Sequence, residues 1–257
     1  MTSAIEQAIA LIRDAKRIVA FSGAGISTEA GIPDFRSEGG LWDDAELMER
    51  MSAQGFRRNP AGFYRASMRL MLNMHNAQPT VAHRLLAELE AQGKLIAVIT
   101  QNIDGLHQAA GSQTVYEIHG TFRVGTCQGC AARHTMAPFY EQLERGEIAS
   151  PHCAACGSPI KPDVVLFGDL LPVNVWEKAV AAATGCDLML VMGSSLVVYP
   201  AAELPRMALS AGAKLVIVNR EEADYDRLAS AVVRMQLGDF ARKTLSKLGA
   251  GASDSLS

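Results

Sequence analysis

The sequence has no excess of basic residues and no long apolar run. Its 24 Lys and Arg against 27 Asp and Glu give a formal net charge of −3, so it lacks the basic footprint with which proteins grip nucleic-acid phosphates. Its most apolar stretch, 188–205, is interrupted by Gly193, Ser194, Ser195 and Glu203, which excludes an 18-residue membrane span there. We therefore expect neither nucleic acid nor membrane as a direct partner.

A secretory signal and a disulfide framework are also lacking. Residues 1–17 carry Glu6 and Asp14 among their apolar positions instead of a basic segment followed by an apolar one. The five cysteines are odd in number, and their arrangement does not favour paired disulfides. Both observations lead us to expect a cytoplasmic protein. With 49% hydrophobic and 20% charged residues, the chain has the composition of a globular protein.

Short apolar runs alternate with helical spacing along most of the chain. Runs that end at small or polar residues, as strands buried on both faces do, occupy 18–21, 95–100, 115–118, 164–167, 188–192 and 215–218. Helical spacing of apolar residues occupies 4–16, 80–92, 174–184 and 200–211. The alternation predicts an α/β fold, a Rossmann-like parallel sheet covered by helices.

Two stretches interrupt this alternation. Residues 37–79 are rich in Met, Arg and Phe at helical spacing, and residues 121–163 hold two cysteine pairs. We interpret both as parts of a smaller domain, helical and zinc-binding, inserted into the larger one. The larger domain would then comprise 1–36, 80–120 and 164–248, and the small polar tail 249–257 is expected to be disordered.

The cysteine pairs have the spacing of a metal site. Cys127 and Cys130, like Cys153 and Cys156, are separated by two residues, and 22 residues lie between the pairs. Four thiolates complete a tetrahedral zinc shell and leave no position for water, so the zinc would be structural and not catalytic. Redox or disulfide use is the alternative. We interpret the fifth cysteine, Cys186, as a small packing residue.

A glycine-containing loop follows the first predicted strand. Gly23 and Gly25 form a G-x-G pattern, but Thr28 stands where a dinucleotide fingerprint has its third glycine. No acidic ribose-binding residue is evident about 20 positions further on. The loop therefore fits either close approach to a phosphate or a plain tight turn, and these departures disfavour a hydride-transfer dehydrogenase.

Small or polar residues also follow the later predicted strands. They occupy 100–104, 119–120, 193–195 and 219–220. Because the carboxyl ends of parallel strands meet at one edge of a sheet, where ligands bind, we expect these segments and the glycine loop to form one site.

Several motifs together resemble the sirtuins, a family of NAD-dependent protein-lysine deacylases. They are GAGIST (23–28), GIPDFR (31–36), TQNID (100–104), HG (119–120), VVLFGD (164–169), GSSL (193–196), VVYP (197–200) and the two cysteine pairs. They run in family order over nearly the whole chain, and 193–205 is especially similar to bacterial and archaeal members. The resemblance implies that NAD and an acetyl-lysine protein or peptide meet between the domains. The acetyl group would pass to ADP-ribose, with release of nicotinamide.

The resemblance also implies roles for individual residues. His119 would be the base that activates a ribose hydroxyl, a role that suits a neutral imidazole, with Asn102 and Asp104 completing the catalytic set. NAD would be held by Gly23, Ala24, Gly25, Thr28, Asp34, Phe35, Arg36, Gln101, Asn102, Ile103, Asp104, Gly193, Ser194, Ser195, Asn219 and Arg220, with a further contact near 236–238. The substrate backbone would pair by strand addition with Val165, Leu166, Phe167, Gly168 and Val198.

The acyl group follows from a comparison within the same family. Sirtuins that remove acidic acyl groups carry a Tyr and an Arg three residues apart, on one helical face. Here Tyr64 is present, but Ser67 occupies the Arg position, and Arg65 and Arg69 lie about 100° and 140° away around the helix. We therefore expect deacetylation, extending to other neutral acyl groups, over desuccinylation.

Two other functions fit the same motifs. A protein ADP-ribosyltransferase would share the cofactor steps, and a non-enzymatic NAD sensor would need no base at His119. The oligomeric state expected is a monomer. NAD and zinc are the cofactors expected.

Overall fold

The computed structural model describes residues 3–34 and 45–249, and its centre is a six-stranded sheet in the order β3-β2-β1-β7-β8-β9. All neighbouring strands of this sheet are parallel. The strands are β1 (Ile18–Ser22), β2 (Leu95–Thr100), β3 (Val115–Glu117), β7 (Leu188–Met192), β8 (Lys214–Val218) and β9 (Ala231–Val233). The chain builds outward from β1 in one direction through β2 and β3, and in the other through β7 to β9. The loops after β1 and β7 therefore meet where the strand order reverses.

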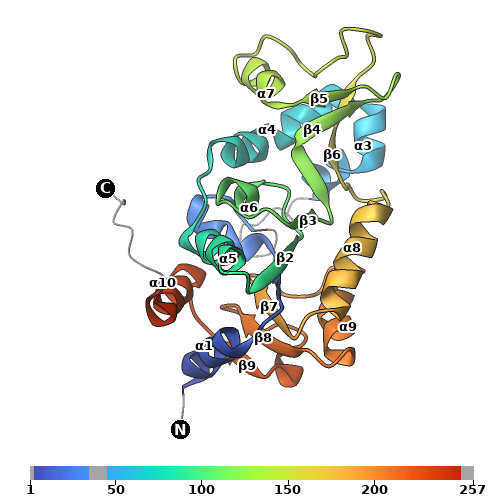
Figure 1. The fold of residues 1–257 in the computed structure, drawn as a ribbon. Coiled ribbons are helices and arrows are strands. Elements are labelled where there is room, and N and C mark those ends of the chain that lie inside the picture. The colour runs from blue at the N-terminus through green and yellow to red at the C-terminus, as the bar shows by residue number, and fades with distance from the viewer. Residues whose placement is uncertain (1–2, 35–44, 250–257) are drawn as a thin grey trace.

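Helices cover both faces of this sheet (Figure 1). On one face, Ala8, Leu85 and Phe240 pack against strand residues such as Leu190. They come from α1 (Ala4–Asp14), α5 (Val81–Ala91) and α10 (Leu237–Leu248). On the other face α8 (Val173–Thr184) and α9 (Leu204–Ser210) contribute small residues that include Ala179 and Ala208. The predicted parallel sheet between helical layers is confirmed.

A second, antiparallel sheet of three strands has the order β5-β4-β6 and lies at the other end of the molecule (Figure 1). Its strands are β4 (Gly120–Cys127), β5 (Arg133–Thr135) and β6 (Ile160–Val164). It packs with α2 (Ala45–Arg50), α3 (Ala53–Arg58), α4 (Pro60–Asn76) and α7 (Ala137–Glu144) around a core of its own. Phe56, Phe63, Tyr64 and Tyr140 are fully buried in this core.

Short elements lie between the two sheets or at their edges. They are η1 (Ala24–Ile26), η2 (Thr28–Ala30), α6 (Leu106–Ala109), η4 (Ala201–Glu203) and η5 (Asp226–Leu228). The helical prediction for 200–211 is resolved into η4 followed by α9. No helix among residues 3–34 and 45–249 is long and apolar enough to cross a membrane.

The structure corrects the prediction of a parallel strand over 164–167. Only Val164 lies in a strand, and that strand, β6, pairs antiparallel with β4 in the smaller sheet. Burial alternates along β6, with Lys161 and Asp163 half-buried between buried neighbours. Lys161 and Asp163 interrupt the apolar run, so the continuous apolar residues begin only at Val164. The predicted strand therefore lay too far toward the carboxyl end of the chain. The run 115–118 is also not buried on both faces, since β3 is a half-buried edge strand.

Candidate active site

The floor of the site is a direct backbone contact between the loops after β1 and β7. The N–H of Gly25 donates to the carbonyl of Gly193 at 3.0 Å. A Cβ added at Gly25 would lie 2.8 Å from Cα of Gly193, and one at Gly193 would lie 2.5 Å from N of Ile26. Gly193 also has φ +67°, a conformation that glycine adopts without strain. These glycines therefore let two loops touch at the strand-order reversal, a role beyond that of a plain turn.

The same loop is tied to the last helix. Glu29, in η2, accepts a hydrogen bond from the N–H of Gly238 at 2.8 Å. Gly238 lies in the first turn of α10, which has no side-chain cap from its N-cap residue Gln236. A carboxylate at this end of a helix satisfies a free N–H and interacts favourably with the helix dipole. Gln236 lines the main cavity, and the NAD contact expected near 236–238 stays a prediction.

The loop after β2 is fixed to the glycine loop by buried polar groups. Asn102 Nδ2 donates to the carbonyl of Gly23 at 3.1 Å and to Ser27 Oγ at 3.2 Å. Ser27 Oγ in turn donates to Asp104 Oδ2 at 2.6 Å, and the N–H of Leu106 donates to Oδ1 at 3.0 Å. Burial raises the pKa of Asp104, and the hydrogen bonds from Ser27 and Leu106 oppose that rise. Ser27 had no role in the sequence analysis, although it lies within GAGIST.

His119 is held by one hydrogen bond between its Nδ1 and the carbonyl of Gln101, at 3.1 Å. A carbonyl only accepts, so Nδ1 carries the hydrogen, and Nε2 of the neutral ring is left as an acceptor. Burial lowers the pKa of His119, and the bond to Gln101 partly opposes this. Gln101 Nε2 donates to Ser194 Oγ at 2.8 Å, so the loops after β2, β3 and β7 are linked in series.

One cavity of about 500 Å³ joins these loops, a size typical of small-molecule sites. Its lining includes His119 and the predicted NAD-binding residues Gly23, Ala24, Gly25, Thr28, Asp34, Gln101, Asn102, Ile103, Asp104, Gly193, Ser194, Ser195, Asn219 and Arg220. The remaining two predicted residues, Phe35 and Arg36, lie outside the described residues. The backbone cradle at the glycines fits a dinucleotide in this cavity, as does Nε2 of His119, which has no hydrogen-bond partner among residues 3–34 and 45–249.

All five predicted substrate residues line the same cavity: Val165, Leu166, Phe167, Gly168 and Val198. The segment 165–168 is not a regular strand, and its backbone groups are bonded to three different partners instead of one neighbouring strand. The N–H of Val165 donates to the carbonyl of His119 at 2.8 Å, and the N–H of Leu166 to Asp169 Oδ2 at 3.2 Å. The carbonyl of Phe167 accepts from the N–H of Ala53 at 3.1 Å. The segment is thus anchored directly beside His119.

An apolar wall of the cavity was missed from the sequence. One face of α4 supplies Phe63, Ser67, Leu70, Met71 and Met74, spaced as residues that share a helical face are. The same periodicity is visible in the Met-rich stretch 37–79, which we interpreted as part of the smaller domain without assigning it a role in the site. Nothing in the spacing alone distinguishes a face that lines a cavity from one that fills a core.

Tyr64 is turned away from this wall. Its side chain is fully buried, and its hydroxyl donates to the carbonyl of Ile160 at 2.7 Å. Burial raises the pKa of Tyr64, so the phenol stays protonated and committed to that bond. Arg65 and Arg69 are exposed, as expected from their angular positions on the helix.

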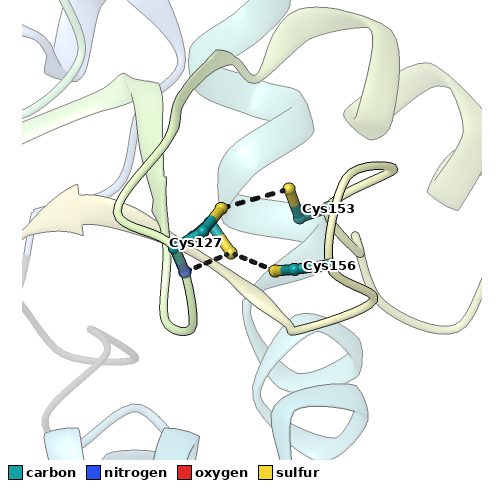
Figure 2. Close-up of side chains that lie close together, drawn as sticks. Cys127, Cys153 and Cys156 are labelled. Carbon is teal, nitrogen blue, oxygen red and sulfur yellow. Dashed lines mark hydrogen bonds between the residues drawn. The ribbon is translucent and has the colours of Figure 1, made fainter.

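The cysteines form a compact cluster at one edge of the smaller sheet (Figure 2). The sulfur of Cys127 lies 3.3 Å from that of Cys156, and the sulfur of Cys130 lies 3.7 Å from that of Cys153. All four sulfurs lie within 4.8 Å of one another. Backbone N–H groups of Gly129 and Cys130 point at the sulfur of Cys127, at 3.4 and 3.5 Å.

This cluster fits zinc. Tetrahedral zinc with Zn–S bonds of about 2.3 Å places its ligand sulfurs about 3.8 Å apart, close to the separations in the cluster. Two of the ligands are buried and two are exposed. The cysteine cluster is at the far end of the smaller sheet and does not line the main cavity, so the ion it suits is structural.

The fold and the cavity define an α/β protein that binds a dinucleotide where the order of its parallel strands reverses. The model of the Sir2 family matches residues 23–200, and the chain belongs to this family. It is 44% identical to NAD-dependent protein deacylase 2 of Archaeoglobus fulgidus, over 96% of this chain and 97% of the relative. It is 41% identical to an NAD-dependent protein deacetylase of Thermotoga maritima, over 93% and 96%.

The likeness extends to solved structures. A Sir2 complex with a p53 peptide and NAD+ superposes with a TM-score of 0.87 at 39% identity, and the match covers 98% of this chain and all of the other. The predicted family membership and α/β fold are confirmed. The functions of the individual site residues, and the boundaries between the two predicted domains, stay predictions.

Proposed function

We propose that this Sir2 family member is an NAD-dependent protein-lysine deacetylase, which transfers the acetyl group to ADP-ribose and releases nicotinamide. The observation that carries the proposal is the position of His119. Its Nε2 is an unprotonated acceptor, and it lines one cavity together with the glycine loop and the segment 165–168. The names of the relatives, deacylase and deacetylase, support the same activity.

Bound NAD would supply the ribose carbon that accepts the acyl oxygen and the hydroxyl that must lose a proton. His119 takes that proton at Nε2, while the Gln101 carbonyl keeps the hydrogen on Nδ1. Asn102 and Asp104 position the nicotinamide ribose, because both are fixed through Ser27 to the glycine loop. We assign the phosphates to the loop 23–28 and to Ser194 and Ser195, and the adenosine end to Asn219 and Arg220.

The substrate is an acetyl-lysine protein or peptide held along 165–168 and Val198. Two N–H groups of 165–168 are already bonded within the chain, so strand addition would use the remaining backbone groups. Apolar cavity walls suit the lysine stem once acetylation has removed its charge. The four cysteines, Cys127, Cys130, Cys153 and Cys156, would hold a structural zinc.

Neutral acyl groups suit this cavity better than acidic ones. Ser67 donates its hydroxyl hydrogen to the carbonyl of Phe63 at 2.8 Å, and Tyr64 donates to the smaller sheet instead of the cavity. Neither offers the paired Tyr and Arg that would bind a carboxylate. Other neutral acyl-lysines, reaching toward Met71 and Met74, are the alternative substrates.

The proposal is tested by mass spectrometry of an acetyl-lysine peptide incubated with the protein, with and without NAD. NAD-dependent loss of acetyl with formation of O-acetyl-ADP-ribose is expected, and His119→Ala should slow it by about 10²–10⁴-fold, the usual contribution of a general base. Succinyl-lysine peptide should be turned over far less than the acetyl peptide. Transfer of ADP-ribose to protein without acetyl loss would instead favour an ADP-ribosyltransferase.

We also infer that the protein acts in the cytoplasm as a monomer, without nucleic acid. The balanced charge and the free cysteines support this inference. Cell fractionation and the mass of the purified protein in solution test it.

A further inference from the structure

A second pocket, of about 380 Å³, lies beside the substrate segment. It shares Val164, Val165 and Asp169 with the main cavity, so both open along the same stretch of chain. Its other walls come from α3, from β6 and from the residues before α8. A peptide lying along 165–168 would therefore pass this pocket with the side chains that flank its acyl-lysine.

The carboxylates of this pocket are already paired. Asp169 Oδ2 lies 2.9 Å from Lys161 Nζ. Asp163 accepts from Thr126 Oγ1 at 2.7 Å and lies 3.4 Å from Arg133 Nη2. These contacts compensate both negative charges and leave the pocket without a free acidic group.

Arg57 is the charged residue of this pocket that none of these ion pairs includes. It lines the pocket, is exposed, and has no ion-pair or hydrogen-bond partner among residues 3–34 and 45–249. Its position is fixed relative to the substrate segment, because the N–H of Ala53 donates to the carbonyl of Phe167. Ala53 and Arg57 are four residues apart in α3 and so lie on one face of it. An uncompensated cation thus stands over a pocket next to the predicted peptide path.

We propose that this pocket is a subsite for an acidic side chain of the protein substrate, near the acyl-lysine, with Arg57 as its cationic partner. The proposal rests on the proposed function. A single exposed arginine binds a free anion too weakly to form a binding site by itself. A carboxylate on a peptide already anchored by its acyl-lysine is different, because its local concentration is high.

The test is a binding experiment with fluorescent acetyl-lysine peptides that carry Glu, Ala or Lys at each flanking position in turn. At one or two positions Glu should tighten binding by about two- to five-fold over Ala, the range of an exposed ion pair, and Lys should weaken it. Arg57→Ala should abolish the difference, and Arg57→Glu should reverse it. The preference should shrink at high salt because exposed charges are screened.

Arg58→Ala is the matched control. Arg58 is the next residue of α3 and carries the same charge, but it does not line the pocket and is paired with Glu49 at 3.1 Å. Its removal should leave the Glu preference intact. A Glu preference absent at every position, or unchanged in Arg57→Ala, overturns the subsite.

Turnover of the Ala peptide distinguishes failure of the proposed subsite from failure of the proposed deacetylase activity. Turnover without any charge preference overturns the subsite alone. A preference in binding without turnover supports the subsite and overturns the deacetylase activity, and failure of every peptide to bind overturns both.

Discussion

At the scale of single residues, His119 is set up to remain neutral. Burial lowers its pKa, and its hydrogen bond to the carbonyl of Gln101 leaves Nε2 as an acceptor that can take a proton. A general base fails when it becomes protonated, so activity should fall as the pH drops through this lowered pKa. We expect the acidic limb of the kcat profile to have its midpoint below pH 6.5, the ordinary histidine value. Steady-state rates with the acetyl peptide, checked for recovery on return to neutral pH, measure it; a midpoint above that value contradicts the prediction.

The contact between Gly25 and Gly193 predicts a strong effect of one methyl group. Gly25→Ala places Cβ 2.8 Å from Cα of Gly193, and such overpacking costs about 1–3 kcal/mol. Because it separates the two loops of the floor, NAD binding should weaken several-fold as well. Calorimetric titration with NAD and urea denaturation measure the two effects.

Gly31→Ala is the control for this variant. Gly31 has φ +82° but nothing within 4 Å of an added Cβ, so alanine there costs only about 1–2 kcal/mol of backbone strain. Its NAD affinity should stay near that of the unchanged protein. Wild-type NAD affinity in Gly25→Ala would show that the floor tolerates separation.

At the scale of elements, α5 and α6 bring two histidines together in the core. His83 and His107 are fully buried with ring centroids 4.7 Å apart. His83 Nδ1 lies 2.8 Å from Thr80 Oγ1, and His107 Nε2 lies 2.8 Å from Ser22 Oγ. Burial lowers the pKa of His83 to about 3 and that of His107 well below its ordinary value. Both rings are therefore neutral in the folded protein.

This pair predicts a loss of stability in mild acid. Below about pH 6.5 the unfolded histidines bind protons and the folded ones do not, so the free energy of unfolding falls as the pH falls. The slope should approach about 1.4 kcal/mol per pH unit for each histidine, down toward the folded pKa, about 3 for His83. His107→Gln keeps a nitrogen for Ser22 without titrating, and should flatten the slope in urea denaturation. His75→Gln, on an exposed side chain, should leave it unchanged.

Elements with a local pattern could be predicted from the sequence, and elements that depend on distant pairing could not. The helix expected over 80–92 is α5, since its apolar spacing and its Thr80 cap are both local. β6 is different, because its charged residues alternate with buried ones and its partner β4 lies far back along the chain. β9 was missed for a similar reason: three residues at a sheet edge carry little pattern of their own.

At the scale of the whole molecule, the site could be anticipated because parallel strands deliver their carboxyl ends to one edge. That rule led us to expect one site at the loops after β1, β2, β3, β7 and β8, and residues from all five loops line the cavity. It could not supply the wall from α4, since which helical face meets a cavity depends on tertiary packing. It also could not reveal that Ser27 joins Asn102 to Asp104, a contact between two loops.

The cysteine cluster predicts that one end of the molecule depends on metal. Purified protein should contain about one zinc per chain, and Cys130→Ser should lose it. Structural zinc contributes about 10–16 kcal/mol of apparent binding free energy in small domains, so the variant or a strong chelator should destabilise the smaller sheet. Elemental analysis and thermal unfolding measure both effects.

Cys186→Ser is the control for the zinc prediction. Cys186 is buried beneath the other sheet, and its sulfur contacts the carbonyl of Ala183 at 3.2 Å. Serine can keep that contact, so zinc content should not change. Metal-free wild-type protein that unfolds as usual in the presence of chelator would contradict a structural zinc.

The contacts of the glycine loop with distant segments tie the site to the order of synthesis. The central strand β1 pairs with β7, and Glu29 holds the N–H of Gly238, 209 residues later. On the ribosome, the glycine loop emerges first but cannot reach its final contacts until α10 has been made. The floor therefore stays incomplete in the nascent chain until Gly238 has been made, and folding dominated by such distant contacts is slow. Activity should appear only once α10 has been made.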